Sequence, residues 1–233
     1  MLSKTKQDEN REIVVLLHGL AAHRILMRIL SNRLERQRFE TMSWGYRSIR
    51  GKIEIHASRL TQLLHQFDRD STISKVHVVA HSMGAIITRT ALTGVNVQKI
   101  SRVVMLGPPN RGSPVAAKLS RVFGFICPSL LQLSDQSDSF VNGLSQLLPC
   151  EVGIIAASRD RVVPIDNTHL HGQTDHVVVK SGHNGLLFRQ VVHDHVDHFL
   201  RHACFVSQSP SLAPNTDSHP AQVAWTGRGQ QIE

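Results

Sequence analysis

The sequence Val78-Val79-Ala80-His81-Ser82-Met83-Gly84-Ala85 places a serine between an apolar run and the start of a helical pattern. This order predicts a strand, a sharp turn and a helix, with Ser82 at the apex. So tight a turn strains the serine backbone, and the residues two before and two after it must therefore be small. Ala80 and Gly84 meet this requirement, although glycine is usual at both positions. The turn would expose the Ser82 hydroxyl at a helix N-terminus, where the helix dipole favours developing negative charge.

A small-x-Ser-x-Gly pattern also arises by chance, so its meaning depends on the rest of the chain. Apolar runs typical of buried parallel strands occur at 13–17, 41–44, 76–79, 103–106, 152–156 and 177–179. Apolar residues at helical spacing connect them at 25–34, at 53–67, directly after Ser82 and at 191–203. We therefore expect an α/β fold with a doubly wound, mostly parallel six-stranded sheet and crossover helices.

The length of 233 residues suits one domain, which we assign to residues 13–205. Residues 1–12 are expected to form a loose N-terminal arm. Residues 206–233 are rich in Ser, Pro, Gln and Gly, which predicts a disordered tail. Segment 113–148 is long for a loop and carries a short amphipathic pattern. We interpret it as a short cap or pocket segment over Ser82; an ordinary crossover helix with irregular ends is the alternative.

The charge balance is basic, with a net charge of +8. The Lys and Arg residues are scattered, without a basic block or interleaved aromatic residues, so we expect no nucleic-acid partner. The basic charge would favour a weak association with anionic membrane surfaces.

The cysteine pattern and the polar N-terminus are typical of a cytoplasmic protein. Cys127, Cys150 and Cys204 form a sparse set of odd number, as expected in a reducing compartment. There is no C-x-x-C motif, so a structural zinc site is not expected. The first ten residues lack the apolar core of a signal peptide, and no apolar run approaches the roughly 18 residues of a membrane span. The sequence leaves open the oligomeric state and a pairing of Cys127 with Cys150.

Candidate partners for Ser82 follow later strands of the predicted sheet. Nucleophilic acyl transfer needs a base, an acid that orients the base, and donors for the oxyanion. His183 is the candidate base, because it lies on the loop after the last predicted strand. Asp160 is the candidate acid, because it also follows a strand end directly, where a doubly wound sheet gathers its chemistry. Asp166 and Asp175 are rival acids.

The candidate oxyanion donors are two backbone N–H groups. Leu20 lies in His18-Gly19-Leu20, directly after the first predicted strand, and Met83 follows Ser82. With these residues in place, the chain resembles the α/β-hydrolase family over about residues 13–203. Because only six strands are visible, it looks like the small bacterial lipase/esterase branch, in which the turn often begins with alanine.

This resemblance implies a serine hydrolase that cleaves carboxylic esters of small molecules or lipids, without a cofactor. Ser82 would attack the acyl carbonyl, His183 would transfer the proton, and Asp160 would orient the imidazole. Water would then hydrolyse the acyl-enzyme. Thioesterase, amidase and acyltransferase activities use the same triad and remain alternatives. A non-catalytic binding protein with the α/β-hydrolase fold is an alternative of a different class.

A second motif, His193-Asp194-His195-Val196-Asp197-His198, resembles the metal-binding signature of the metallo-β-lactamase family. The motif lies within a helical pattern, where its three histidines would not share one face. That fold also needs further ligands downstream, and few residues remain. We interpret the motif as a solvated, histidine-rich helix face and expect no metal site beyond adventitious binding by His195, His198 and His202.

Overall fold

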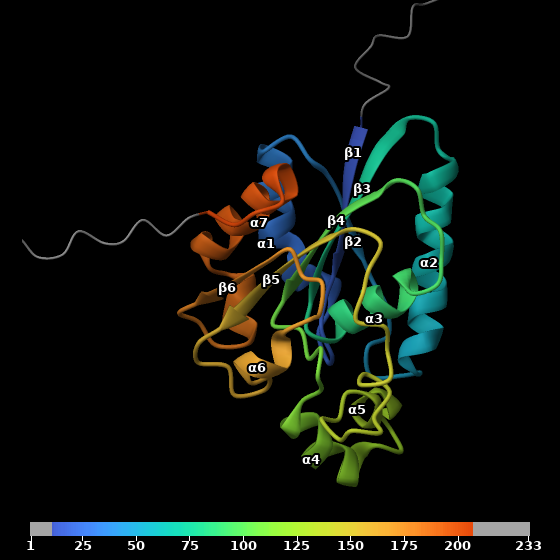
Figure 1. The fold of residues 1–233 in the computed structure, drawn as a ribbon, viewed down its shortest axis with the longest axis vertical. Coiled ribbons are helices and arrows are strands. Elements are labelled where there is room, and N and C mark those ends of the chain that lie inside the picture. Colours follow the sequence, from blue (N-terminus) through green and yellow to red (C-terminus); the bar gives the residue numbers. More distant parts are fainter. Residues whose placement is uncertain (1–10, 207–233) are drawn as a thin grey trace, which may run out of the picture.

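The computed structural model describes residues 11–206, and its centre is a six-stranded sheet in the order β2-β1-β3-β4-β5-β6 (Figure 1). All neighbouring strands are parallel. The strands are β1 (Arg11–Leu17), β2 (Glu40–Trp44), β3 (Ile73–His81), β4 (Ile100–Leu106), β5 (Glu151–Ala157) and β6 (Asp175–Val179). The predicted α/β class and parallel sheet are confirmed. The strand β1 begins inside the expected arm, and the remainder of the arm and the tail beyond residue 206 lie outside the described residues.

Helices cover both faces of the sheet, with α1 and α7 on one side and α2 and α3 on the other (Figure 1). Their bounds are α1 (Arg28–Arg36), α2 (Ile53–Arg69), α3 (Met83–Leu92) and α7 (Gln190–His202). Two 3-10 helices, η1 (Arg24–Met27) and η2 (Asn184–Leu187), precede α1 and α7. Within residues 11–206, none of the helices has the length and apolar character that a bilayer span requires.

The strand β1 shows why the apolar runs are continuous. Val15 and Leu17 pack with α2 and α3, whereas Val14 and Leu16 pack with α1 and α7. Because successive side chains point to opposite faces, a strand covered on both sides must be apolar at every position. The two cores hold the carboxyl ends of the strands together at one edge of the sheet.

The segment after β4 extends beyond that edge as α4 (Pro114–Phe123) and α5 (Pro128–Gln132), followed by irregular chain up to β5 (Figure 1). Ser113 begins α4: its Oγ accepts a hydrogen bond from the Ala116 amide at 3.2 Å, and Pro114 occupies the first helical position. A short helix α6 (Ile165–Thr168) follows β5.

Arg89 is a fully buried cation that joins α3 to the irregular segments around it. Its guanidinium donates hydrogen bonds to the carbonyl oxygens of Asn110, Leu144 and Ser145 at 2.8–2.9 Å. Burial lowers the pKa of Arg89 to about 10, so the side chain remains charged at neutral pH.

We expect Arg89→Met to lower the free energy of unfolding by about 3 kcal/mol, because three hydrogen bonds of a buried cation, one of them to the buried Asn110 carbonyl, would be lost. Urea denaturation, with the exposed Arg59→Met as the matched control, measures this effect. Equal stability of the two variants would contradict the role given to Arg89.

The histidine motif on α7 differs from the expectation of a solvated face. His193 and His195 are buried, and the ring of His193 is 2.9 Å from the carbonyl oxygen of Leu187. That interpretation was therefore wrong for these two residues, because α7 also packs against the turn before it and against Phe205. Among the described residues, no cluster of three His, Cys, Asp or Glu side chains is arranged to hold a metal ion. The three cysteines are free.

Burial of several histidines makes the fold sensitive to acid. Burial lowers the pKa of His77 to about 4, and burial and the nearby His169 lower that of His176 to about 4. The pKa values of His193 and His195 are also lowered, mainly by burial. Each of these groups takes up its proton at a lower pH in the folded protein than in the unfolded chain, where its ordinary pKa is 6.5. The unfolded state therefore binds more protons in this window, and stability falls as the pH decreases.

We expect the melting temperature to fall steeply between about pH 6.5 and pH 4, each such histidine contributing up to about 1.4 kcal/mol per pH unit. Thermal unfolding followed from pH 8 to pH 4 measures the slope. The variant His77→Gln should reduce it, whereas the exposed His202→Gln should not. A melting temperature that is constant from pH 7 to pH 5 would contradict this expectation.

Candidate active site

Ser82 lies at the predicted sharp turn between β3 and α3. Its backbone has φ 52° and ψ −121°, the strained conformation expected of a serine at the apex of this turn. A Cβ atom at Gly84 would lie 2.7 Å from the carbonyl oxygen of His18 and 2.9 Å from Cβ of Leu17. Only glycine therefore lets the first turn of α3 pack against the end of β1.

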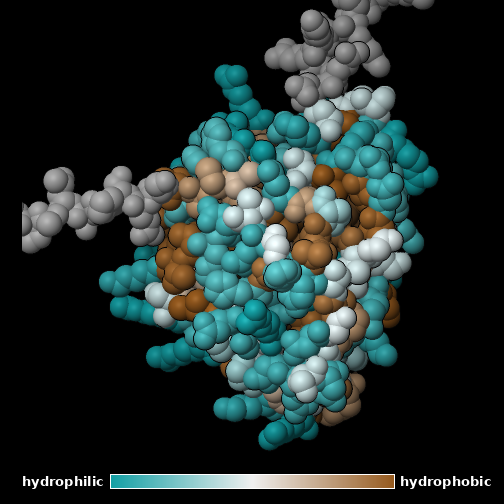
Figure 2. All heavy atoms as spheres, viewed as in Figure 1, coloured by the Kyte–Doolittle hydropathy of each residue, from teal (hydrophilic) through white to brown (hydrophobic). Residues whose placement is uncertain are grey.

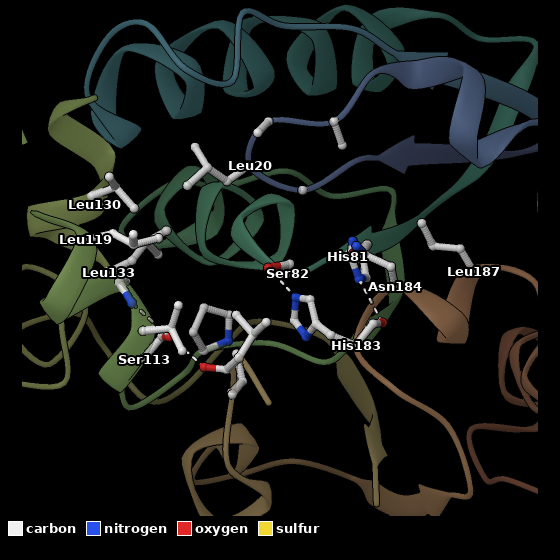
Figure 3. A pocket seen from close by; sticks show the side chains of 18 of the residues that line it. Leu20, His81, Ser82, Ser113, Leu119, Leu130, Leu133, His183, Asn184 and Leu187 are labelled. Carbon is white, nitrogen blue, oxygen red and sulfur yellow. Dashed lines mark hydrogen bonds between the residues drawn. The ribbon is translucent and has the colours of Figure 1, made fainter. Parts of the chain in front are cut away.

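Three predicted residues from distant parts of the chain form one hydrogen-bonded row (Figure 3). Oγ of Ser82 is 2.9 Å from Nε2 of His183, and Nδ1 of His183 is 2.6 Å from Oδ2 of Asp160. An ionised carboxylate only accepts hydrogen bonds, so Nδ1 of the neutral imidazole carries the proton. Nε2 is then the acceptor that faces the Ser82 hydroxyl.

Asp160 is held in this row by its own loop. Its Oδ1 accepts hydrogen bonds from the backbone N–H groups of Val162 and Val163 at 2.8 and 2.9 Å. Burial acts to raise the pKa of Asp160, but the hydrogen bond and charge of His183 and these two amides outweigh it, and the pKa lies below its ordinary value. The carboxylate is therefore ionised at neutral pH.

The rival acids lie elsewhere. Asp175 is the first residue of β6, whereas His183 follows the other end of this strand. Oδ2 of Asp175 accepts a hydrogen bond from the Phe205 amide at 2.7 Å. Asp166 is exposed, in the first turn of α6. Neither carboxylate contacts His183.

The loop after β1 lies directly against the serine. A Cβ atom at Gly19 would be 3.1 Å from Cβ of Ser82, so glycine is what allows this approach. The backbone N–H of Met83 directly follows Ser82 in the chain, and that of Leu20 directly follows Gly19. Within residues 11–206, neither N–H has a hydrogen-bond partner.

Two further buried histidines support this region. The ring of His81 is 4.9 Å from that of His183, and its Nε2 lies 3.3 Å from the His183 carbonyl oxygen. Burial, assisted by His183, lowers the pKa of His81 to about 3, so it is neutral. His18 stacks on Tyr46 at 4.3 Å, and the Tyr46 hydroxyl donates to the His18 carbonyl oxygen at 2.5 Å. Both histidines shape the loops around Ser82.

A cavity of about 350 Å³ opens in front of Ser82 and His183. Its walls come from the loop after β1, from η1 and η2, and from α4 and α5, and they are mostly apolar: Leu20, Ala21, Leu26, Val115, Leu119, Leu130, Leu133, Val163 and Leu187 (Figure 3). Among the residues that line the cavity, none is Asp or Glu.

Some of these wall residues were not predicted from the sequence. Leu26 belongs to the pattern predicted as a helix at 25–34, but that pattern does not indicate a place at the cavity, and Leu187 belongs to the short 3-10 helix η2. Ser113 also lines the cavity, and its Oγ donates to the Val162 carbonyl oxygen at 2.6 Å, which joins α4 to the Asp160 loop. The Ser113-Pro114 pair, a serine cap before a proline at the first helical position, was the signal that could have located the start of α4.

Solved structures with a similar fold include several lipases and esterases. The mature lipase BlEst2 of Bacillus licheniformis has a TM-score of 0.65 and 17% identity, over 76% of this chain and 86% of that chain. Lipase B of Aspergillus fumigatus has a TM-score of 0.66 and 15% identity, over 82% of this chain and 53% of that chain. The esterase Pf2001 of Pyrococcus furiosus has a TM-score of 0.58 and 16% identity, over 83% and 84%. At these identities the likeness shows a common fold.

A comparison with curated proteins finds no match. A family model, described as serine aminopeptidase, S33, matches residues 8–143. The matched part contains the loop with Leu20 and the turn with Ser82, whereas Asp160 and His183 lie beyond it. Since this match covers more than half of the 233 residues and the fold agrees, the chain belongs to the serine aminopeptidase S33 family of α/β hydrolases.

Proposed function

We propose that this protein is a serine hydrolase that cleaves carboxylic esters with Ser82, His183 and Asp160 as its catalytic triad. The observation that carries the proposal is the hydrogen-bonded row of these three side chains at the floor of an apolar cavity. The serine is at a strained turn, the base is in contact with it, and the acid orients the base, which is the geometry that nucleophilic acyl transfer needs.

The first half-reaction forms the acyl-enzyme. Oγ of Ser82 attacks the carbonyl carbon of the ester while Nε2 of His183 takes the hydroxyl proton. Asp160 accepts a hydrogen bond from Nδ1 and stabilises the imidazolium that results. The imidazolium then protonates the leaving alcohol as the C–O bond breaks. In the second half-reaction, His183 activates a water molecule, which releases the acid and regenerates Ser82.

The oxyanion of each tetrahedral intermediate would bind to the N–H groups of Leu20 and Met83. Both amides lack other partners among the described residues, so they need not break a hydrogen bond to act. A donor of this kind contributes about 3 kcal/mol to transition-state stabilisation. The N-terminus of α3 adds a favourable dipole at the same point.

The cavity favours an acyl chain as the part of the substrate that it holds. We propose that α4 and α5 act as a short cap whose leucines, such as Leu119 and Leu130, contact this chain. An aminopeptidase would need a carboxylate to bind the charged amino terminus of its substrate, because a buried ammonium without a partner is costly. No residue that lines the cavity has a carboxylate, and the nearby Asp160 carboxylate is hydrogen-bonded to His183.

Hydrolysis of a matched substrate panel tests this assignment. We expect turnover of p-nitrophenyl acetate and hexanoate and no measurable turnover of leucine p-nitroanilide, with an acyl-coenzyme A added to test the thioesterase alternative. The Ser82→Ala variant identifies any background activity. Turnover of the aminoacyl substrate alone would contradict the ester assignment, and turnover of the thioester alone would replace it.

A further inference from the structure

The loops at the carboxyl edge of the sheet carry an unbalanced positive charge. The loops 18–27, 45–52, 107–150, 158–174 and 180–189 together contain eleven Lys and Arg residues and four carboxylates, those of Asp135, Asp138, Asp160 and Asp166. All eleven cations are exposed, and none is in an ion pair within residues 11–206. By contrast, the acidic residues at the other end of the sheet, such as Glu12, Glu40 and Glu151, form ion pairs with basic side chains. The basic charge of the chain is therefore concentrated on the face that surrounds the cavity.

This same face exposes large apolar side chains around the cavity. On α4, Val115 and Leu119 line the cavity, and Val122 continues their row at helical spacing onto the surface, where it is 62% exposed. Ile126, in the turn after α4, is 54% exposed. At the turn after α4, the side chain of Phe125 is 84% exposed. Apolar side chains of this segment thus lie both on the cavity wall and on the outer surface.

The opposite wall of the cavity repeats this arrangement. Leu26 lines the cavity and is itself partly exposed, while Ile25 and Ile29 beside it are 60% and 51% exposed. Arg24 and Arg28 alternate with these residues on η1 and α1. In Figure 2, hydrophilic side chains project from the lower end of the molecule, where α4 and α5 lie, and a hydrophobic area lies beside them.

We propose that this face, which we call the docking face (segments 24–29 and 114–127), binds the surface of an anionic lipid bilayer. Exposed apolar side chains flanked by Lys and Arg are the combination that enters the headgroup region of anionic membranes, with the apolar groups inserted and the cations near the phosphates. A soluble polyanion would match the positive charge but would leave Phe125, Val122 and Ile126 without an apolar environment. The lipid surface satisfies both features.

Docking of this kind would place the cavity mouth against the bilayer. Leu26 and Leu119, on its two sides, would lie at the depth where ester bonds of lipids are found, and an acyl chain could enter along the apolar row without crossing water. This consequence for substrate supply rests on the proposed ester hydrolysis, whereas the docking itself does not.

Sedimentation with lipid vesicles tests the docking separately from catalysis. The full chain carrying Ser82→Ala would be mixed with vesicles of phosphatidylcholine alone, or of equal parts of phosphatidylcholine and phosphatidylglycerol, at low and high salt. We expect binding to the anionic vesicles that weakens with salt, as the Debye length shortens. Lys118→Glu/Arg121→Glu should reduce the partition coefficient at least about 10-fold, because each cation near the surface contributes to binding. Phe125→Ser should also reduce it, and should do so at both salt concentrations.

The matched control is Arg36→Glu/Arg38→Glu, at the opposite end of the sheet, which lowers the net charge by the same amount, from +8 to +4. It should reduce binding far less than the α4 pair if the docking face is the binding surface. Equal losses in the two double variants, or equal binding to neutral and anionic vesicles, would overturn the proposal. Binding to dextran sulfate but not to vesicles would overturn it in favour of a soluble polyanion.

The two proposals are separated by measuring hydrolysis of the soluble p-nitrophenyl acetate. The same surface variants are used for this, but with the native Ser82 retained. If the protein hydrolyses the ester but does not bind vesicles, the docking proposal is wrong and the proposed ester hydrolysis stands. If it binds vesicles but does not hydrolyse the ester, the proposed ester hydrolysis is wrong and the docking proposal stands.

Discussion

Ser82→Ala and His183→Ala are each expected to lower kcat for ester hydrolysis by about 10⁶-fold, and the double variant by no more than either single variant. The reason is that nucleophile and base act as a unit: without Ser82 the imidazole has no hydroxyl to deprotonate, and without His183 the hydroxyl keeps its proton. The 2.9 Å contact between Oγ and Nε2 is the interaction that both substitutions remove. Steady-state hydrolysis of p-nitrophenyl hexanoate measures the effect.

Ser113→Ala is the matched control, since Ser113 is another serine that lines the cavity. Its hydroxyl is bonded to the Val162 carbonyl oxygen and caps α4, so its loss should lower stability by about 1 kcal/mol while leaving kcat within about 10-fold of the wild type. A near-native rate in His183→Ala would show that another group is the base. Additive losses in the double variant would show that the two residues act independently.

Asp160→Asn is expected to lower kcat by about 10⁴-fold while leaving the fold intact. The amide would donate a hydrogen bond to Nδ1 of His183, so the ring proton would move to Nε2. Nε2 could then no longer accept the proton of the Ser82 hydroxyl. The backbone N–H groups of Val162 and Val163 would still bind the remaining side-chain oxygen, which preserves the loop. The pH-rate profile and the melting temperature should be measured together, so that a loss of activity is not mistaken for unfolding.

Asp166→Asn, which removes an exposed carboxylate from the neighbouring α6, serves as the control and should change kcat by less than about 2-fold, as surface substitutions away from special features do little. If Asp166→Asn instead caused the large loss and Asp160→Asn did not, the acid would have been assigned to the wrong residue.

The sheet could be predicted because its strands are buried on both faces. Runs such as 13–17 and 103–106 are apolar at every position, and only turn and helix patterns separate them. The positions of Ser82, Asp160 and His183 could be predicted for a related reason: each follows a strand end, and parallel strands bring those ends to one edge. The strained φ of Ser82 followed from the small residues around it.

Features that depend on contacts between distant segments could not be predicted. The burial of His193 and His195 depends on how α7 packs against Leu187 and Phe205, which the helical spacing alone does not specify. From the sequence, Arg89 would be expected to be an exposed cation on a helix. In the structure it is buried, and the carbonyl groups of Asn110, Leu144 and Ser145 accept its hydrogen bonds. The concentration of scattered Lys and Arg residues on one face likewise becomes visible only once the loops are assembled.

Labelling with a fluorophosphonate probe, followed by peptide mass spectrometry, tests the central claim most directly. The probe forms a covalent bond only with a serine whose hydroxyl is activated by a neighbouring base and whose oxyanion site can stabilise the adduct. We predict stoichiometric labelling of the wild type on Ser82, with none in Ser82→Ala and strongly reduced labelling in His183→Ala. Folded wild-type protein that remains unlabelled, or that is labelled on a serine other than Ser82, would contradict the account.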